Sequence, residues 1–478
     1  MKKFILSFLL FASGFISYCQ VPVLNWTGIL NAGGQKIELR LHLVQNPDKT
    51  YTSNWDVPAQ KAKGIPSSKT EVSNNQISIE IKMIGASYLG TLNASSDKME
   101  GTWGQSGMSF PLTMEPLKEG QSETVITKPQ TPKPPFSYIV KDFVYEGANT
   151  HLTYGCTLTY PTQNKQYPLV ILITGSGRQD RDETIFDHKP FAVIADYLTK
   201  KGFAVLRVDD RGAGKSTGDF STSTTADFAL DVEEHISYAK TLPMVDASKI
   251  GLLGHSEGGL IAPMVAARNK SVAFMVLMAG PGIEITELMA LQNEMVLKSA
   301  GISQQAINAY IPLYKNLMKS IITTDNKDAA IVKAKEITKP WVESTDKNLV
   351  KLTTNISSDD DMDKFATTMA ETLSTKWWKF FAAYNPQPAL QKVKCPVLAI
   401  NGSADIQVPA EANLKGIEQT LKMGGNKHFS TKQFEGLNHL FQKCTKCTVP
   451  EYGELETTIE PAVLETIGTW LTGLTSLN

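Results

Sequence analysis

Two patterns of hydrophobic and polar residues divide the chain. As far as about residue 116, apolar and polar residues alternate, for example over residues 36–44 (KIELRLHLV) and 76–84 (QISIEIKMI). This alternation has the two-residue period of strands that bury one face. Turn-forming Gly, Asn, Asp and Ser residues interrupt it at short intervals. We therefore predict a small antiparallel β domain over residues 20–117.

From about residue 137 the pattern changes to short apolar runs separated by amphipathic stretches. The apolar runs lie at residues 169–173, 204–208, 250–254 and 273–278. Runs without alternation are typical of parallel strands that are buried on both faces. The helical stretches between them lie at residues 190–201, 225–241 and 258–268, and Thr225 is the expected cap of the second. The pattern predicts an α/β fold with a mostly parallel, doubly wound sheet.

Residues 283–390 interrupt this alternation, because they are rich in helical patterns and carry no pattern of a buried strand. The sheet resumes at residues 396–400 and 430–434, and a helix closes the chain over residues 461–473. We predict an α/β domain over residues 137–478, with a helical lid inserted between two of its strands. The aromatic residues Trp377 and Trp378 near the end of the insert line either a substrate pocket or a core.

Residues 118–136 connect the two regions. Four prolines lie in this segment, at positions 129, 132, 134 and 135, among Thr, Gln and Lys. Proline-rich segments of this kind favour an extended and stiff chain. We predict a linker between the β domain and the α/β domain.

The first residues have the composition of a secretory signal peptide. Two lysines precede an apolar run over residues 4–16, and Ser17 and Cys19 offer small side chains at the −3 and −1 positions of a cleavage after Cys19. We predict a signal peptide over residues 1–19 and export of the mature chain to the periplasm or the extracellular space. The alternatives are a membrane anchor and a lipid-modified Cys19, and the large Tyr18 argues against the second. No later run is long enough to span a membrane, so we expect no stable span after signal removal.

Composition excludes several classes of function. The 47 basic and 48 acidic residues nearly cancel, which gives no electrostatic preference for nucleic acid. Apolar residues make up 42% of the 478 residues, near the value of globular proteins. Five cysteines and seven histidines are too few for a disulfide-rich scaffold or a protein with several zinc sites.

The mature chain keeps four cysteines. Cys444 and Cys447 form a Cys-x-x-Cys motif, and a local disulfide in an oxidising compartment is the favoured interpretation. Half a zinc site and a redox motif are the alternatives, although neither a second ligand pair nor a thioredoxin-like pattern accompanies the motif. Cys156 and Cys395 lie in apolar runs and are expected to be buried free thiols. We predict no metal site.

The residues Gly-His-Ser-Glu-Gly at 254–258 follow a predicted buried strand and open a predicted helix. This is the context of a nucleophile elbow, in which Gly254 and Gly258 let the chain turn tightly beside its neighbours. We predict Ser256 as the nucleophile and the N–H group of Glu257 as one oxyanion donor. The alternative is a glycine-rich turn without chemistry.

A nucleophilic serine needs a base, and the base needs a group that orients it. Asp405 follows the strand at residues 396–400, and His439 follows the strand at residues 430–434. We predict these residues as the orienting acid and the base, since strand ends carry them in this order. The acidic run 359–361 is expected to be a solvated loop of the insert. The alternative for His439 is a surface histidine.

The loop over residues 174–183 follows the first buried strand, where a second oxyanion donor is expected. We predict the N–H group of Ser176 for this role, with Gly177 next to it. The charged residues from Arg178 to Glu183 form either a salt-bridge network, which is favoured, or a polar subsite. The glycine-containing turn at residues 209–216 lacks the spacing of a phosphate-binding loop.

These motifs together resemble the α/β-hydrolase superfamily. The loop 175–183 (GSGRQDRDE), combined with the elbow at 254–259 (GHSEGG), is similar to the EstD-type carboxylesterases. The resemblance covers about residues 137–475 and implies a lidded serine esterase that acts on short acyl esters without a cofactor. It also implies kinship with the serine aminopeptidase-like hydrolases. Arg178 stands where that family often has proline, which affects one subsite.

We therefore expect an exported serine hydrolase that cleaves short-to-medium acyl esters through the predicted triad, with a small-molecule ester as its partner. A peptidase that acts on short peptides is the second hypothesis. The third is a ligand-binding protein with a vestigial hydrolase domain, in which Trp26, Trp55 and Trp103 form a binding face of the β domain. Core packing is the alternative for these tryptophans.

Overall fold

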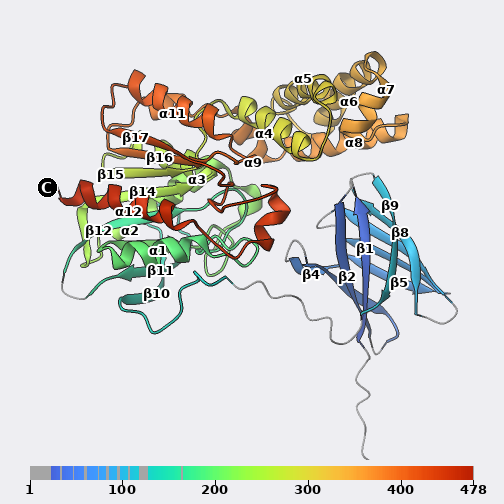
Figure 1. Cartoon of the computed structure of the whole chain (residues 1–478), viewed down its shortest axis with the longest axis horizontal. Coiled ribbons are helices and arrows are strands. Elements are labelled where there is room, and N and C mark those ends of the chain that lie inside the picture. Colours follow the sequence, from blue (N-terminus) through green and yellow to red (C-terminus); the bar gives the residue numbers. More distant parts are fainter. Residues whose placement is uncertain are drawn as a thin grey trace, which may run out of the picture. The chain divides into compact units, whose positions relative to one another are not determined.

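The computed structural model describes residues 23–476, apart from 33–34, 47, 59–61, 74, 82–84, 94–96, 106–107, 118–127 and 163–164. The predicted signal peptide, residues 1–19, lies outside the described residues. The chain divides into two compact units, one formed mainly by residues up to 121 and one by the residues after it (Figure 1). Among the described residues, no helix combines the length and the apolar character that crossing a membrane requires.

The first unit is built from strands, as the alternating pattern predicts. Its nine strands are ordered β4-β3-β2-β1-β9-β8-β7-β6-β5. They are β1 (Val23–Ala32), β2 (Gln35–Gln45), β3 (Tyr51–Val57), β4 (Ala62–Pro66), β5 (Lys69–Ser73), β6 (Gln76–Ile81), β7 (Ala86–Leu92), β8 (Met99–Gln105) and β9 (Met108–Pro116). Sequential neighbours such as β1 and β2 pair antiparallel. This topology is that of an all-β unit.

The three tryptophans of the β unit lie in its core. Trp26, Trp55 and Trp103 are all buried. The ring of Trp55 contacts the ring of Trp103 at 5.1 Å and that of Tyr88 at 5.8 Å, both edge to face. Edge-to-face packing of this kind stabilises aromatic clusters. The structure therefore favours core packing over an exposed binding face.

The second unit contains an eight-stranded sheet in the order β10-β11-β13-β12-β14-β15-β16-β17. Its strands are β10 (Ile139–Glu146), β11 (Thr153–Tyr160), β12 (Tyr167–Ile173), β13 (Ala204–Val208), β14 (Val245–His255), β15 (Val272–Met278), β16 (Val397–Gly402) and β17 (Phe429–Phe434). β11 pairs antiparallel with both of its neighbours, β10 and β13. The strands β13, β12, β14, β15, β16 and β17 pair parallel in this order. The mostly parallel sheet is as predicted.

Helices cover both faces of this sheet (Figure 1). They are α1 (Pro190–Lys200), α2 (Thr225–Ala239), α3 (Glu257–Ala266), α11 (Ala410–Met423) and α12 (Pro461–Ser476). Apolar residues of α1 and α12 share one core with the sheet, and those of α2, α3 and α11 share another. The sheet is therefore doubly wound, which explains why its strands carry continuous apolar runs.

The cap of α2 is Thr224, and the prediction of Thr225 was wrong by one residue. The Thr224 side chain accepts a hydrogen bond from the N–H group of Asp227, whose carboxylate accepts one from the N–H group of Thr224. This reciprocal pair is a capping box. Thr225 is the first helical residue, which frees its hydroxyl group for the contact described below.

Seven helices of the described chain lie between β15 and β16. They are α4 (Ile285–Ser299), α5 (Gln304–Ile321), α6 (Lys327–Ser344), α7 (Lys347–Thr354), α8 (Asp359–Leu373), α9 (Lys376–Ala383) and α10 (Gln387–Leu390). Several of them share a small core that includes Leu317, Ile321 and Ala366. The acidic run 359–361, expected as a loop, is the first turn of α8, where negative charge stabilises a helix.

The second half of the predicted linker packs on the α/β unit, whereas residues 118–127 lie outside the described residues. Lys128 is buried, and its Nζ donates to the carbonyl of Gly453 at 3.1 Å. The Gln130 side chain donates to the carbonyl of Ile459 at 2.7 Å and accepts from the N–H group of the same residue at 3.0 Å. These contacts make the segment from Lys128 onward part of the α/β unit.

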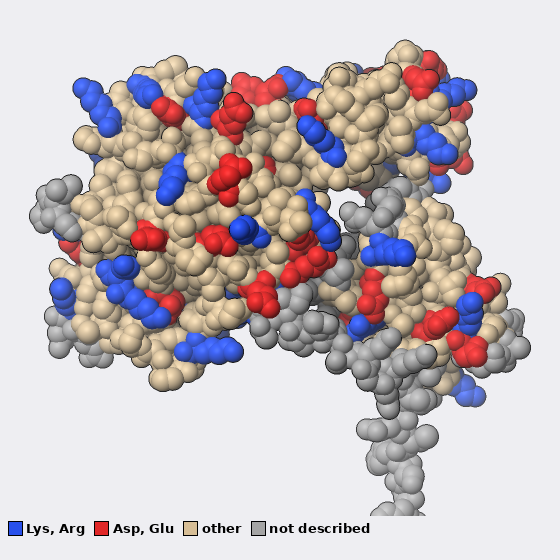
Figure 2. All heavy atoms as spheres, viewed as in Figure 1, with Lys and Arg blue, Asp and Glu red and all other residues tan. Residues whose placement is uncertain are grey.

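Acidic and basic side chains are interspersed on the face of the molecule shown in Figure 2. This matches the formal net charge of −1. The face therefore lacks the extended positive surface that nucleic-acid binding favours.

Replacing Leu252 by Ala in the central strand β14 should lower the free energy of unfolding of the α/β unit by about 2–5 kcal/mol. Leu252 is fully buried within the core shared with α2, α3 and α11. Urea unfolding followed by circular dichroism measures the change. Leu230→Ala on α2 is the control, because Leu230 is 46% exposed and should change stability by less than about 0.5 kcal/mol. Equal losses in the two variants would contradict the assigned core.

Candidate active site

Ser256 lies between the end of β14 and the start of α3. Its backbone has φ 53° and ψ −117°, an arrangement that a residue with a side chain rarely adopts. Such a conformation costs about 1–3 kcal/mol and persists only where its surroundings enforce it. The N–H group of Ser256 donates to the carbonyl of Met278 in β15 at 2.9 Å, and its own carbonyl accepts from Gly259. This is the geometry predicted for a nucleophile elbow.

Two glycines make the turn possible. A Cβ atom on Gly254 would lie 2.1 Å from the carbonyl oxygen of Gly258. A Cβ atom on Gly258 would lie 2.1 Å from the carbonyl oxygen of Ile173 in β12. Because both neighbours are backbone atoms that cannot move aside, only glycine fits at these positions.

Asp405 and His439 come from loops that follow β16 and β17, and the structure brings them together. His439 Nδ1 lies 2.7 Å from Asp405 Oδ2, and both side chains are buried. The other carboxylate oxygen accepts from the N–H groups of Gln407 and Val408 at 2.8 and 2.9 Å. Since a carboxylate accepts, Nδ1 of the histidine donates to it and Nε2 is left as the basic nitrogen.

Ser256 and His439 both line one cavity, which has a volume of about 330 Å³. The helical insert contributes part of its apolar wall. The apolar lining residues are Leu288 and Met289 of α4, Trp377, Trp378 and Phe381 of α9, together with Ile185, Phe186, Pro281, Val408, Leu440 and Val449. The cavity size is that of a site for a small molecule.

The predicted oxyanion donors differ in their placement. Ser176 lines the cavity beside Ser256, whereas Gly177 lines a neighbouring cavity and not this one. Glu257 is the first residue of α3, so its N–H group has no acceptor within the helix. The N–H group of Gly175 is already used, because it donates to Glu183 Oε1 at 2.6 Å.

The charged loop after β12 forms ion pairs. Arg181 donates through two nitrogens to Asp209, at 2.9 and 2.6 Å. Asp182 accepts from Arg207 of β13 and pairs with Lys189 at 3.4 Å. These contacts fit the favoured salt-bridge network. Glu183 departs from it and contacts the elbow.

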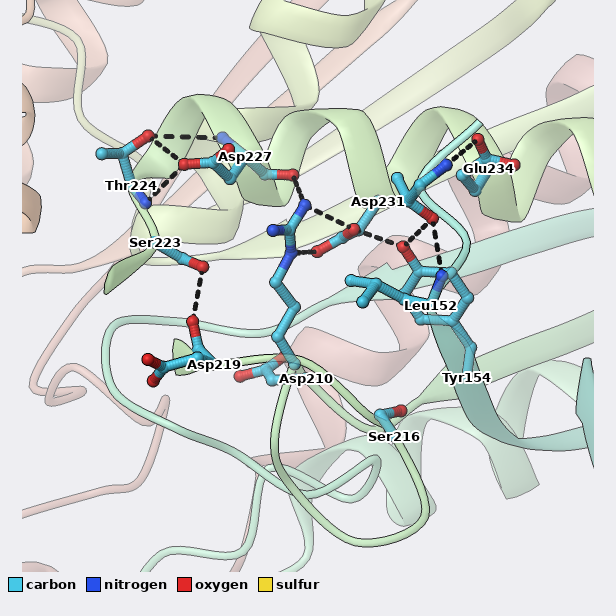
Figure 3. Close-up of polar contacts among 12 residues, drawn as sticks. Leu152, Tyr154, Asp210, Ser216, Asp219, Ser223, Thr224, Asp227, Asp231 and Glu234 are labelled. Carbon is cyan, nitrogen blue, oxygen red and sulfur yellow. Dashed lines mark hydrogen bonds and ion pairs between the residues drawn. The ribbon is translucent and has the colours of Figure 1, made fainter. Parts of the chain in front are cut away.

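The turn after β13 packs against this loop and against α2. The Asp210 carboxylate accepts from the hydroxyl of Thr174 at 2.7 Å and from the N–H group of Gln179 at 2.9 Å. Burial raises the pKa of Asp210 to about 8. Arg211 pairs with Asp231, which also accepts from the hydroxyl of Tyr154 (Figure 3). The turn is therefore structural, in agreement with the absence of a phosphate-loop spacing.

The side chain of Glu257 is a functional feature that sequence reasoning missed. It is buried, and its Oε1 accepts from the hydroxyl of Thr225 at 2.6 Å and from the indole N–H of Trp377 at 2.9 Å. Burial raises the pKa of Glu257 above its ordinary value, although donors that include Ser176 act in the opposite direction. One carboxyl thus joins the elbow to α2 and to the insert helix α9.

Cys444 and Cys447 form a disulfide. The nearby Glu451 carboxylate accepts from the N–H groups of Thr445, Lys446 and Cys447. Although the three side chains lie within ligand distance of one another, both sulfur atoms are committed to the disulfide. The geometry therefore fits a pinned loop rather than a metal site.

The disulfide loop leads into a short 3₁₀ helix, Val449–Glu454, whose Val449 and Tyr452 line the cavity. The other two cysteines are free. Cys156 is buried as predicted, whereas Cys395 is only half-buried because it precedes β16 instead of lying within it.

Comparison with known proteins identifies the family. Residues 188–443, more than half of the chain, match the family model described as serine aminopeptidase, S33. The chain belongs to this family. Its fold is the α/β-hydrolase fold, and the protein is a hydrolase. The resemblance stated from the sequence motifs is thereby confirmed.

Two curated relatives match parts of this hydrolase. Esterase EstD of Thermotoga maritima is 32% identical over 146 residues, which are 30% of this chain and 34% of EstD. An uncharacterized 31.7 kDa protein of Escherichia coli, from the traX-finO intergenic region, is 30% identical over 127 residues. That match covers 26% of this chain and 42% of the relative. The chain thus spans well under two thirds of the length of either relative.

Among solved structures, the esterase PF2001 of Pyrococcus furiosus is similar, with a TM-score of 0.42 and 16% identity. The match covers 71% of this chain and 91% of that chain. Est1E of Butyrivibrio proteoclasticus, solved with bound ferulic acid, has a TM-score of 0.40 and 16% identity. This match covers 70% of this chain and 99% of the Est1E chain.

Replacing Asp405 by Asn should lower kcat by about 10³–10⁴-fold, because an amide no longer holds Nδ1 of His439 as a donor. Initial rates with p-nitrophenyl acetate measure the change. Asp360→Asn in the exposed first turn of α8 is the matched control and should leave the rate unchanged. An Asp405→Asn enzyme that keeps more than about a tenth of the rate would refute the orienting role.

Proposed function

We propose that this hydrolase cleaves carboxylic esters of small, uncharged molecules through an acyl-enzyme formed on Ser256. The observation that carries the proposal is the shared cavity, onto which the strained serine, the Asp405-supported histidine and an apolar wall all open. The relationship to esterase EstD supports an ester as the substrate.

In the acylation step, Ser256 Oγ attacks the ester carbonyl carbon while His439 Nε2 takes the hydroxyl proton. Asp405 stabilises the imidazolium that forms. The carbonyl oxygen becomes an oxyanion and accepts from the N–H groups of Glu257 and Ser176. When the tetrahedral intermediate collapses, the bond to the alkoxy oxygen breaks, and His439 gives its proton to the leaving alcohol.

In the deacylation step, a water molecule attacks the acyl carbon while His439 takes one of its protons. The bond between Ser256 Oγ and the acyl carbon then breaks, and His439 returns the proton to the serine oxygen. The carboxylic acid leaves, and the enzyme is restored.

The wall of the cavity favours an apolar acyl or alcohol group. Among the described residues that line the cavity there is no Lys or Arg, and the acids are Glu183 and Glu257. Both acids already accept hydrogen bonds from protein groups. An apolar cavity without an available charge binds uncharged substrates best.

A peptidase that acts on short peptides is the second candidate, favoured by the description of the family model. An aminopeptidase has to bind a free α-ammonium group, for which an unengaged acid is the suitable partner. Aminoacyl-p-nitroanilides, assayed beside the p-nitrophenyl esters, separate the two candidates.

We further propose that the helical insert acts as a lid and that the chain is exported. Helices α4 and α9 supply part of the apolar wall of the cavity that Ser256 lines, and Trp377 of α9 bonds to the elbow residue Glu257. The signal-like residues 1–19 and the Cys444–Cys447 disulfide both support an oxidising compartment.

Replacing Ser256 by Ala should abolish turnover, with a loss of at least about 10⁴-fold, because no other group can carry the acyl intermediate. The melting temperature should stay within a few degrees of the wild-type value. Turnover of p-nitrophenyl acetate and butyrate measures the loss, and Ser299→Ala on the exposed end of α4 is the control. Retained turnover would refute Ser256 as the nucleophile. A wild-type chain without any turnover would instead favour the ligand-binding role of the β unit with a vestigial hydrolase.

Replacing Trp377 by Ala should shift chain-length preference toward longer acyl groups. The Trp377 ring lines the cavity and stacks on Phe381 at 4.6 Å, so its removal lengthens the available space. We expect the ratio of kcat/KM for the octanoate to that for the acetate ester to rise by about tenfold.

The control for this shift is Trp341→Ala. Trp341 lies in α6, does not line the cavity, and donates to the carbonyl of Ala309 at 2.9 Å. A Trp377→Ala enzyme with the wild-type ratio, or a Trp341→Ala enzyme with the same shift, would contradict the assignment of the wall.

A further inference from the structure

A second pair of a histidine and a carboxylate lies beside the first one. His255 Nδ1 is 3.0 Å from Glu183 Oε1. Their side chains are 6% and 1% exposed, so solvent does not screen the contact. His255 directly precedes Ser256, and Glu183 ends the charged loop that follows β12. The proposed mechanism assigns neither residue a role.

Both residues also bond to loops of the proposed active site. Glu183 Oε1 accepts from the N–H group of Gly175, next to the proposed oxyanion donor Ser176, at 2.6 Å. His255 Nε2 lies 3.0 Å from the carbonyl oxygen of His439. Two hydrogen bonds and one ion pair thus connect three segments. They are the loop 174–183, called here the oxyanion loop, the elbow at Ser256, and the loop after β17 that carries His439.

The hydrogen-bond geometry fixes one proton of His255. A carbonyl oxygen can only accept, so Nε2 of His255 carries a hydrogen atom. Nδ1 faces the Glu183 carboxyl group. Burial by itself lowers the pKa of His255, but Glu183, the His439 carbonyl and Asp405 outweigh burial and raise it above its ordinary value. The surroundings of His255 therefore favour its protonated form.

Glu183 is held in an unfavourable state, although other residues also hold its loop. Its φ is 52°, a value that strains a residue with a side chain. Its Oε2 atom is buried and has no hydrogen-bond partner among the described residues. Arg181 and Asp182 already tie the same loop to the sheet through Asp209 and Arg207. Backbone strain and a buried carboxylate oxygen without a partner point to a functional constraint on Glu183.

The loops approach each other closely at this point. A Cβ atom on Gly175 would lie 3.2 Å from Glu183 Oε1 and 3.2 Å from Ser256 Cβ. The rings of His255 and His439 are 4.8 Å apart. Small movements of Glu183 or His255 would therefore displace the oxyanion donor and the base relative to the serine.

We propose that Glu183 and His255 are positioning residues that hold the oxyanion loop and the His439 loop at fixed positions relative to Ser256. Both residues line the cavity, and their bonds to the neighbouring loops go to backbone groups. The pair acts through the N–H group of Gly175 on one side and the carbonyl of His439 on the other. This inference rests on the proposed esterase function and deepens it.

Two matched pairs of variants of the full chain test the proposal. Glu183→Gln is compared with Glu234→Gln, and His255→Gln with His235→Gln. Glu234 is a buried acid of α2 that accepts from the N–H groups of Ala148 and Asn149 at 2.8 Å. His235 is a buried histidine of α2 that bonds to the Tyr145 hydroxyl.

Turnover of p-nitrophenyl butyrate is expressed per active site, with sites counted by end-point fluorophosphonate titration. Glu183→Gln and His255→Gln should each lower kcat by about 10–100-fold and leave KM within about twofold of wild type. The two controls should keep the wild-type kcat. The double variant should lose little more than the worse single variant, because the two residues act as one unit.

A purely structural role would give a different result. It would lower the melting temperature and the number of titratable sites but leave kcat per site unchanged, and this outcome would overturn the proposal. Equal losses in the α2 controls, or independent losses that multiply in the double variant, would overturn it too. Failure of the esterase function itself would be recognised separately, because the wild-type enzyme would then not turn over p-nitrophenyl butyrate, whether or not the fluorophosphonate labels Ser256.

Discussion

The strained turn at Ser256 is the constraint on which the rest of the α/β unit depends. A serine with φ 53° has to be held there by its neighbours, and the neighbours are backbone atoms of β12, β15 and α3. They can approach only because positions 254 and 258 carry glycine. The same turn directs α3 so that the N–H group of Glu257 begins the helix without an internal acceptor. Nucleophile and oxyanion donor are therefore fixed by a single piece of backbone.

Buried polar groups connect this turn to its surroundings. The carboxyl of Glu257 reaches α2 and α9, and the pair of Glu183 and His255 reaches the loops after β12 and β17. Inside a protein such bonds are strong when every member is satisfied and costly when a partner is lost. The contact with Trp377 also means that the helical insert and the elbow share one hydrogen-bond network. Glu257 is the residue that joins the proposed lid to the proposed catalytic turn.

Features that depend on neighbouring residues could be predicted from the sequence. The apolar runs predicted the strands of the sheet, and the glycine spacing around residue 256 predicted the elbow. Asp405 and His439 followed from their positions after strands. The sequence also contained the signal for the capping box of α2, although the predicted cap was Thr225. Asp227 has the required three-residue spacing from Thr224 and not from Thr225.

Features that depend on contacts between distant residues could not be predicted. Trp377 is 120 positions from Glu257, and Lys128 is 325 positions from Gly453, so no local pattern links them. The pair of Glu183 and His255 was hidden for the same reason, although both residues stood in the motifs. Their roles depend on which of several charged side chains turns toward the elbow, and tertiary packing decides that.

The most direct test of the account is to map the site of covalent modification by a fluorophosphonate on the wild-type chain with peptide mass spectrometry. We expect one modified residue, Ser256, and a loss of ester turnover in proportion to the modified fraction. Modification at another residue, or full turnover by a chain modified at Ser256, would contradict the assignment of this turn as the catalytic centre.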